Sequence, residues 1–148
     1  MRIDVDRPLL KSLLLIGAVV EARDAYTGGR LWRVSRFSRL LAEQAGLSGD
    51  EIARISVGGF LHDLGKVGVP DAIVNKPARL TNDEYDIIKT HPAIGEGRIA
   101  EHPLAVLAQD AIRHHHERVD GGGIRIDLAR PKFRWKRALC RLRTFLTR

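Results

Sequence analysis

Apolar residues recur at helical spacing through most of this chain, and no alternating strand pattern extends beyond a few residues. The first apolar face runs from Leu9 to Val20 and precedes a turn over residues 24–29. A second helix is expected from Leu31 to about Gly46. A length of 148 residues suits one domain with one core. The sequence therefore predicts an all-α bundle without a second domain.

Two capping boxes mark the starts of later helices. Ser48 is followed by Glu51 and Thr81 by Glu84, a spacing at which each side chain satisfies a free backbone amide near the other. The first box opens a helix that continues through Phe60. The prolines predict a loop at Pro70 and Pro77, and they suit the first turn of a helix at Pro92 and Pro103.

Five side chains are candidate metal ligands. His62 and Asp63 stand side by side at the end of an apolar run, and His91, His115 and His116 follow downstream. Imidazole nitrogen and carboxylate oxygen together suit iron, manganese or zinc, and a carboxylate can bridge two such ions. A lone His-Asp pair is more often a helix-end hydrogen bond than a metal site, but three further histidines favour a metal centre.

The net charge of +7 is confined to one end of the chain. Residues 124–148 hold nine of the 25 Lys and Arg residues and one of the 18 Asp and Glu residues. Residues 1–123 therefore carry 16 basic and 17 acidic side chains, which is close to neutral. Because a nucleic-acid site needs a basic patch, we expect no nucleic-acid partner for the body of the chain.

The compartment is indicated by one cysteine and by the absence of a long apolar run. Cys140 cannot form an internal disulfide, which fits the reducing cytoplasm. The longest uncharged run, Ser12 to Val20, is shorter than the roughly 20 residues that cross a bilayer. Asp4 and Asp6 also disfavour a signal peptide. We expect a cytoplasmic protein without a transmembrane segment.

Four motifs occur in a fixed order along the chain. They are His62-Asp63-Leu64-Gly65-Lys66 through Pro70, then Asn75-Lys76-Pro77, then Lys89-Thr90-His91-Pro92, then His114-His115-His116-Glu117-Arg118 followed by Asp120-Gly121. In order and spacing they resemble the HD-GYP family, a bacterial branch of the HD phosphohydrolases. That family hydrolyses the second messenger cyclic di-GMP at a site with two or three metals. The similarity begins near Leu9 and runs to about Gly123.

The resemblance implies an HD-domain-like helical bundle and a role for each candidate residue. Asp63 would be the bridging carboxylate, His62 would bind one metal, and His91, His115 and His116 would bind the other. Lys66 would neutralise a phosphate oxygen in the transition state, so Asp63 and Lys66 are the expected catalytic residues. The alternative for Lys66 is a purely structural contact with helix carbonyls.

Two departures from the family pattern affect the metals. Arg30 follows Tyr26-Thr27-Gly28-Gly29 where the family has its first histidine ligand, and a guanidinium cannot bind a metal because it offers only donors. The family's last ligand, an Asp further downstream, has no counterpart. We therefore expect a divalent ion such as iron or manganese, with at most one ion held well.

The pattern ends where the family continues Asp-Gly-x-Gly-Tyr-Pro. Here Asp120-Gly121-Gly122-Gly123 is followed by Ile124-Arg125-Ile126-Asp127, and codons for this stretch read one base earlier can spell Gly-Tyr-Pro-Asp-Arg. Our hypothesis is that residues after about Gly122 are out of frame. We thus predict an HD-GYP-like domain over 1–123, incomplete at its C-terminus, and a basic tail over 124–148 that is out of frame or disordered. A basic amphipathic helix is the alternative for the tail.

Three functions are open from the sequence. The chain could be a cyclic di-GMP phosphodiesterase impaired by the loss of two ligands. It could be a catalytically inactive HD-GYP module for signalling or protein contact, with a dimer or a signalling protein as partner. It could also be a gene fragment without a function of its own.

Overall fold

The computed structural model describes residues 6–24 and 28–117 and is helical over that part of the chain, without a strand. The all-α prediction is confirmed. Residues 1–5, 25–27 and 118–148 lie outside the described part, so the predictions for the middle of the turn over residues 24–29, for the change of frame after about Gly122 and for the basic tail stay predictions. The elements in chain order are α1 (Arg7–Arg23), α2 (Arg30–Gln44), α3 (Gly49–Leu61), η1 (Leu64–Gly68), α4 (Asp71–Val74), α5 (Asn82–Ile88), α6 (His91–Ile99), η2 (Ala105–Leu107) and α7 (Gln109–His114).

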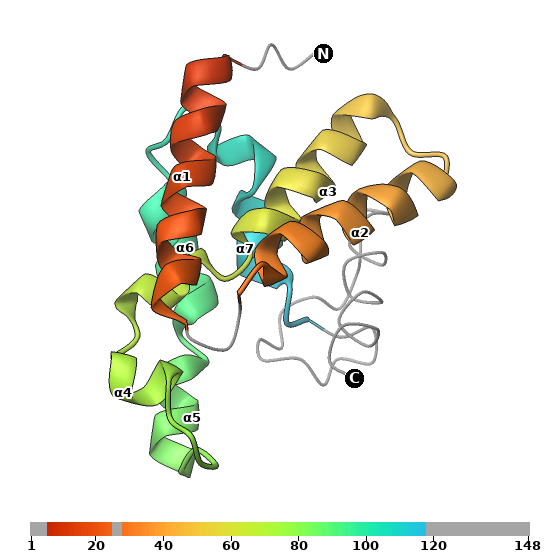
Figure 1. The fold of residues 1–148 in the computed structure, drawn as a ribbon. Helices are drawn as coiled ribbons and strands as arrows, with labels where there is room; N and C mark the ends of the chain where they lie inside the picture. The colour runs from red at the N-terminus through yellow and green to blue at the C-terminus, as the bar shows by residue number, and fades with distance from the viewer. Residues whose placement is uncertain (1–5, 25–27, 118–148) are drawn as a thin grey trace.

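Helices α2 and α3 form an antiparallel pair, and α1 packs against the end of this pair (Figure 1). The chain turns between α2 and α3 at Gly46, whose φ of 66° is in the left-handed region that favours glycine. Leu47 N donates to Ala42 O and Gly46 N donates to Glu43 O, which completes a Schellman motif. The expected end of this helix near Gly46 is therefore confirmed.

Both predicted capping boxes are present in the structure. Ser48 caps α3 and Thr81 caps α5, in each case with the reciprocal hydrogen bond from a glutamate at the third helical position. Pro92 lies in the first turn of α6, as expected. The loop predicted at Pro70 was incomplete, and the first-turn position predicted for Pro103 was wrong. Pro70 caps the short helix α4 instead of continuing a loop, and Pro103 lies in a turn before the 3₁₀ helix η2, outside its first turn.

The core lies where α1, α3, η1, α6, η2 and α7 meet. Phe60 and Leu61 at the end of α3 are almost fully buried. Gly17 lets α1 pack closely against the end of α3, because a Cβ at Gly17 would lie only 2.7 Å from Phe60 Cε1. The largest buried cluster consists of Leu13, Val20, Leu31, Phe60, Leu61, Leu64, Ile99, Leu104, Ala105, Leu107, Ala108 and Ile112.

Glycines also set the spacing between η1, α6 and α7. A Cβ on Gly65 would lie 1.6 Å from the carbonyl oxygen of His91, and one on Gly95 would lie 2.6 Å from Ile112 Cγ2. These contacts exist only because both residues lack a side chain. They bring the end of α3, the start of α6 and the end of α7 together.

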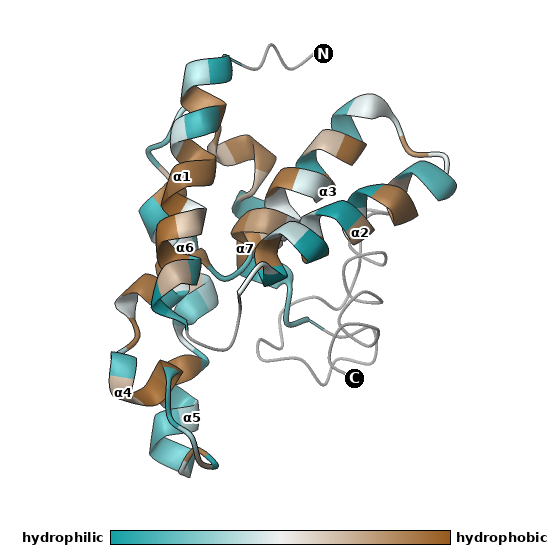
Figure 2. Ribbon diagram, in the orientation of Figure 1, coloured by the Kyte–Doolittle hydropathy of each residue, from teal (hydrophilic) through white to brown (hydrophobic). Residues whose placement is uncertain are grey.

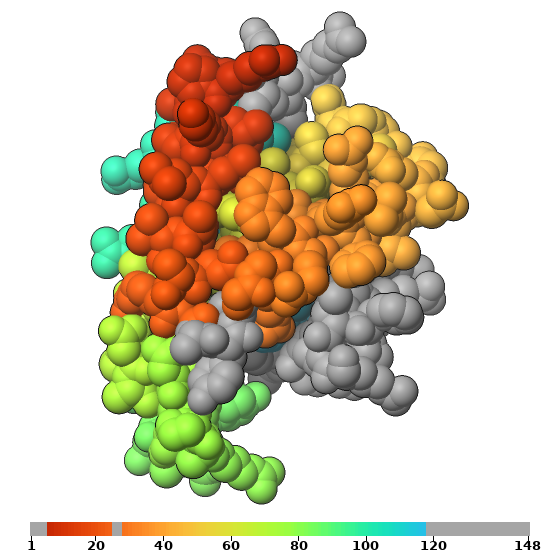
Figure 3. All heavy atoms as spheres, viewed as in Figure 1, coloured from red at the N-terminus to blue at the C-terminus, as the bar shows by residue number. Residues whose placement is uncertain are grey.

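Helix α1 carries large apolar side chains on its exposed surface. Leu15 is 65% exposed and Val19 is 58% exposed, and brown turns of α1 are visible on its outer side in Figure 2. In the space-filling view, α1 and α2 lie next to each other on one face of the molecule (Figure 3).

None of the helices within residues 6–24 and 28–117 combines the length and the apolar character needed to cross a bilayer.

Candidate metal centre

Three helix ends supply the candidate ligands. His62 and Asp63 directly follow α3, His91 is the first residue of α6, and His115 and His116 follow α7. The contact of Gly65 with the backbone of His91 fixes α6 against η1. Asp63 and three of the histidines are buried, namely His62, His91 and His115. Residues distant in sequence are thus brought together on the inner side of the bundle.

Three of the imidazole rings are oriented by the same type of hydrogen bond, from Nδ1 to the backbone carbonyl three residues earlier. The Nδ1 atom of His62 lies 2.8 Å from Gly59 O, that of His91 lies 2.6 Å from Ile88 O, and that of His115 lies 2.9 Å from Ile112 O. A carbonyl oxygen only accepts, so each Nδ1 carries the proton and donates it. In the neutral ring the lone pair is then on Nε2. Such a bond to the far nitrogen is how proteins fix the tautomer of a metal-binding histidine.

The Nε2 atoms of His91, His115 and His116 converge on one point, beside Asp63. His91 Nε2 lies 3.0 Å from His115 Nε2 and 3.2 Å from His116 Nε2. Asp63 Oδ1 lies 3.5 Å from His91 Nε2 and 3.7 Å from His115 Nε2. The ligand atoms of these four residues all lie within 4.8 Å of one another.

These donors fit a divalent cation. Two neutral rings that both donate through Nδ1 present lone pairs to each other, which is unfavourable unless a proton or a cation lies between them. Zinc–nitrogen bonds of about 2.0–2.1 Å place neighbouring nitrogen ligands roughly 3 Å apart. The observed separations of 3.0 and 3.2 Å match that spacing. Three imidazoles and one carboxylate are also a donor set that suits iron, manganese or zinc.

The two oxygens of Asp63 have different neighbours. Oδ1 faces the three converging imidazoles, whereas Oδ2 lies 3.3 Å from His62 Nε2 and 2.9 Å from Lys66 Nζ. His62 is therefore adjacent to the four-residue cluster but contacts the other oxygen of the shared carboxylate. The structure thus places His62 on one oxygen of Asp63 and the other histidines of the cluster on the opposite oxygen, and the assignment of these residues to metals stays a prediction.

Electrostatics in the cluster favour the metal-binding protonation states. Burial opposes ionisation of Asp63, but His62 and Lys66 outweigh that effect and hold the pKa of Asp63 well below its usual range. Burial lowers the pKa of His91, and burial together with His62 and His116 holds the pKa of His115 well below its usual range. An ionised carboxylate beside neutral imidazoles is what a divalent ion requires.

Lys66 is part of the same network. Burial disfavours its charge, but Asp63 and Asp24 outweigh burial, so the pKa of Lys66 is raised. Its Nζ lies 2.9 Å from Asp63 Oδ2 and 2.9 Å from Asp24 Oδ2. Lys66 is on the 3₁₀ helix η1, whose first turn places it over Asp63, and Lys66 N donates to Asp63 O.

Asp24 is the residue of this network that sequence reasoning did not single out. It is buried and follows α1, and none of the four motifs that carry the resemblance contains it. The neighbouring Arg23 fixes its position, because Arg23 pairs with Asp71 and donates to Val67 O, while Asn75 donates to Arg23 O. These bonds tie the end of α1 to the segment that carries Lys66.

The other histidines and Arg30 lie outside the cluster. Arg30 is the partly buried first residue of α2. His102 accepts a hydrogen bond from Leu104 N at 3.1 Å and lies 3.5 Å from Ser12 Oγ, as expected for an ordinary hydrogen-bonding residue. His114 does not belong to the four-residue group either.

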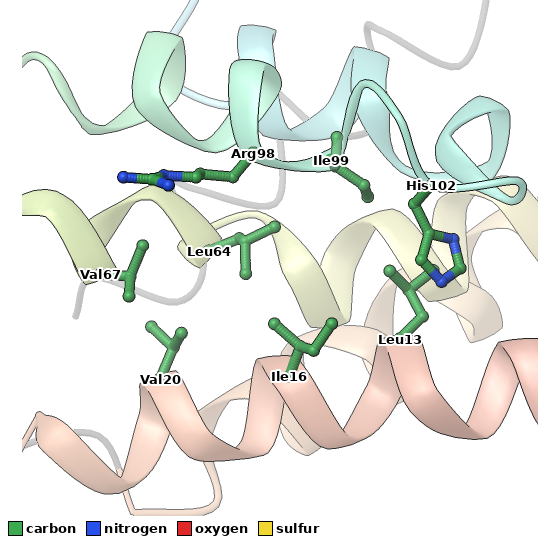
Figure 4. A pocket seen from close by; sticks show the side chains of 8 residues that line it. All are labelled: Leu13, Ile16, Val20, Leu64, Val67, Arg98, Ile99 and His102. Atoms are coloured by element: carbon green, nitrogen blue, oxygen red, sulfur yellow. The ribbon is translucent and has the colours of Figure 1, made fainter.

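A separate apolar cavity of about 380 Å³ lies between α1, η1 and α6 (Figure 4). Its polar lining residues are Arg98 and His102, at opposite ends of the view, and none of the candidate metal ligands lines it. Because no group of acids and bases converges on this cavity, it is not the site of the predicted chemistry. Its apolar lining residues are Leu13, Ile16, Val20, Leu64, Val67 and Ile99.

Comparison with known proteins gives consistent matches. A family model described as HD domain matches residues 27–145. The chain is 38% identical over 123 residues to the cyclic di-GMP phosphodiesterase response regulator RpfG of Xanthomonas campestris, which covers 81% of this chain and 32% of the relative. It is 35% identical over 111 residues to a cyclic di-GMP phosphodiesterase of Pseudomonas aeruginosa, covering 74% and 27%. It is also 35% identical over 108 residues to the 3'3'-cGAMP-specific phosphodiesterase 3 of Vibrio cholerae, covering 72% and 23%. The chain thus spans a third or less of the length of these relatives.

Proposed function

Because this chain belongs to the HD domain family, we propose that it is a metal-dependent phosphodiesterase of the HD-GYP type that acts on a cyclic dinucleotide. The proposal includes one well-held divalent ion, iron or manganese by resemblance, and a catalytic rate below that of an intact family member. Cyclic di-GMP is the proposed substrate, since relatives at 35–38% identity are named for its hydrolysis. A relative named for 3'3'-cGAMP makes that molecule the competing substrate.

One observation carries the proposal. The ligand atoms of Asp63, His91, His115 and His116 lie within 4.8 Å of one another in the interior of the bundle. Burying the carboxylate of Asp63 and the imidazoles of His91 and His115, with His116 partly buried beside them, is costly unless they share a ligand or a proton. A group with perturbed pKa values that converges on one point is typical of a functional site.

The proposed roles follow from the contacts of each side chain. Asp63, His91, His115 and His116 would hold the ion, and a divalent cation supplies positive charge that stabilises a phosphodiester transition state and makes water more acidic. Lys66 would place an ammonium beside the centre, where it can stabilise a negatively charged phosphate oxygen. The backbone bonds of His91 and His115 keep both Nε2 atoms directed at the ion.

A specific observation favours a second candidate function. Arg30 stands where the family has a histidine ligand, so the second ion of a dinuclear centre has lost a ligand. If one ion alone does not support hydrolysis, the chain would be a catalytically inactive HD-GYP module that binds the metal and serves in signalling or protein contact. The cytoplasmic location, and a second copy or a signalling protein as partner, are part of the proposal in either case.

The test is metal content together with hydrolysis. The purified chain would be assayed with cyclic di-GMP and 3'3'-cGAMP, with products separated by liquid chromatography and bound metal determined by mass spectrometry. Metal with slow hydrolysis supports the phosphodiesterase, and metal without hydrolysis supports the inactive module. His115→Gln should lose the metal, whereas His102→Gln, a histidine outside the cluster, should keep it. A wild-type chain that binds no divalent ion would refute both functions.

A further inference from the structure

The apolar cavity between α1, η1 and α6 has a buried floor and an exposed rim (Figure 4). The floor includes Leu13 and Ile99, which are 1% and 2% exposed. The rim includes Ile16 and Val67, which are 45% and 42% exposed, so the cavity is open to solvent. Its volume of about 380 Å³ is within the range of small-molecule sites, roughly 300–1,000 Å³. Because apolar surface in contact with water is unfavourable, an apolar ligand that fits this space would gain free energy by entering it.

One end of the cavity carries a positive charge. Arg98, in the last turn of α6, lines the cavity near Val67. Within the described part of the chain no carboxylate pairs with its guanidinium, whereas Arg23, Arg39 and Arg113 each have such a partner. None of the described residues that line the cavity is acidic. A guanidinium binds a carboxylate through two parallel hydrogen bonds, so this end favours a ligand that carries a carboxylate.

The opposite end of the cavity has a histidine whose ring is already hydrogen-bonded to the protein. His102 Nδ1 accepts from Leu104 N at 3.1 Å, so in the neutral ring the proton is on Nε2, which lies 3.5 Å from Ser12 Oγ. Ser12 Oγ in turn donates to Leu9 O. Since the polar atoms at this end have protein partners, the polar group of a ligand would lie at Arg98 and its apolar part would extend toward His102.

We propose that this cavity binds a free aliphatic carboxylate of the medium-chain fatty acid class. The carboxylate pairs with Arg98, and the hydrocarbon chain packs against Leu64 and Ile99 toward the His102 end. Apolar walls with one cation at the end are complementary to a molecule with an apolar chain and one negative end. The inference does not rest on the proposed phosphodiesterase function, because none of the candidate metal ligands lines the cavity.

The cavity adjoins the short helix that carries Lys66. Leu64 and Val67 of η1 line the cavity and are three residues apart, and Asp63 and Lys66 form a second pair at the same spacing. Residues three apart in a 3₁₀ helix share a face, so the cavity and the metal centre contact different faces of one element. A ligand in the cavity would therefore pack directly against the segment that holds Lys66.

The first test compares ligands that share one apolar chain. The protein is treated with chelator, so that a carboxylate has no metal to bind, and is titrated by calorimetry with decanoate, decanol and decylamine below their aggregation limits. We expect decanoate to bind most tightly and decylamine least, since the guanidinium attracts the first and repels the second. Acetate, which lacks the chain, should not bind. Equal binding of decanoate and decylamine, or no saturable binding of decanoate, would overturn the proposal.

The second test changes the charge. Arg98→Gln should weaken decanoate binding about threefold to tenfold, the range expected for a charge pair that is partly open to solvent, and should leave decanol binding unchanged. Arg36→Gln, which removes an exposed arginine on α2, is the matched control and should bind both ligands as the wild-type chain does. Equal affinity of Arg98→Gln and the wild-type chain for decanoate would contradict the assigned role of the guanidinium.

The third test blocks the cavity. Ile16→Trp places a large ring at the rim and should abolish binding of both decanoate and decanol. Leu15→Trp is its control, since Leu15 is exposed on the same helix but is not among the lining residues. Circular dichroism checks folding, and Val67→Trp, at the other exposed rim position, serves if Ile16→Trp does not fold.

Two results of these titrations would place the ligand elsewhere. Unchanged decanoate binding by a folded rim variant would show that the fatty acid does not enter the cavity. Binding of phosphatidylglycerol vesicles without binding of free decanoate would show that the apolar surface serves a lipid bilayer instead of a free carboxylate. Either result overturns the proposal.

Discussion

The Nε2 atoms of His91 and His115 lie 3.0 Å apart, although each ring donates its Nδ1 proton to a backbone carbonyl. Two neutral rings so arranged present lone pairs to each other. The polypeptide therefore holds a repulsive arrangement that a cation would relieve. The buried, ionised carboxylate of Asp63 next to both rings adds the negative charge that attracts a cation. Metal binding should thus stabilise this fold.

We predict that a divalent ion raises the melting temperature of the chelator-treated chain by several degrees. Ligand at a hundred times its dissociation constant stabilises the native state by about 2.7 kcal/mol. His91→Ala should weaken metal binding at least about a hundredfold, since changes in the residues that only orient a ligand already cost 10–100-fold. Thermal melts with and without Mn²⁺ or Zn²⁺ test this, and an equal rise in the variant would show that the metal binds elsewhere.

Gly65→Ala should disrupt the centre through the backbone. A Cβ at this position would lie 1.6 Å from His91 O, and the obstacle is backbone that cannot give way without moving α6. We expect a loss of stability above about 3 kcal/mol, with loss of metal binding, as for other severe overpacking. The matched control is Gly97→Ala on α6, which meets nothing within 4 Å. Because it replaces glycine inside a helix, it should stabilise the chain by about 0.5–1 kcal/mol. Chemical denaturation measures both, and a folded, metal-binding Gly65→Ala protein would contradict the packing described.

Stability of the metal-free chain should fall on mild acidification. The pKa values of His91 and His115 are lowered in the folded state, mainly by burial, so below about pH 6.5 the unfolded chain binds more protons than the folded one. Stability is then fully present above that pH and is lost as the pH falls. The lowered pKa of Asp63 acts in the same direction at more acid pH.

Melting temperatures of chelator-treated protein between pH 7.5 and 5.5 measure this dependence. His115→Asn should flatten the curve. A melting temperature that stays constant or rises on acidification would show that these rings are not held neutral.

The sequence predicted the long elements because they carry strong local signals. Both capping boxes and the end of the second helix were correct, since such signals depend on a few neighbouring residues. The resemblance to the HD-GYP family is confirmed by the HD domain match and by the relatives. The short helices η1, α4 and η2 were not predicted. A helix of three to five residues is too short to show a period, and it is stabilised by its packing.

The residues of the candidate site also differ in how well the sequence predicted them. The sequence singled out five candidate ligands and Lys66, and the structure brings Asp63, His91, His115 and His116 into one group with His62 beside it. The sequence did not single out Asp24, because a single acid before a turn has no local pattern. The contact of Asp24 with Lys66 spans 42 residues. Nor did the sequence reveal why Gly65 is needed, which depends on the backbone of α6.

Replacing Arg30 by histidine alone should not give full phosphodiesterase activity. The change supplies one imidazole, but the downstream aspartate that the family pattern would place at the second ion has no counterpart. We expect one ion per chain and a kcat/KM for cyclic di-GMP close to that of the wild-type chain. Arg36→His, an exposed arginine on the same helix, is the matched control for the loss of positive charge. Robust turnover by Arg30→His, with two ions bound, would mean that the site lacks nothing else.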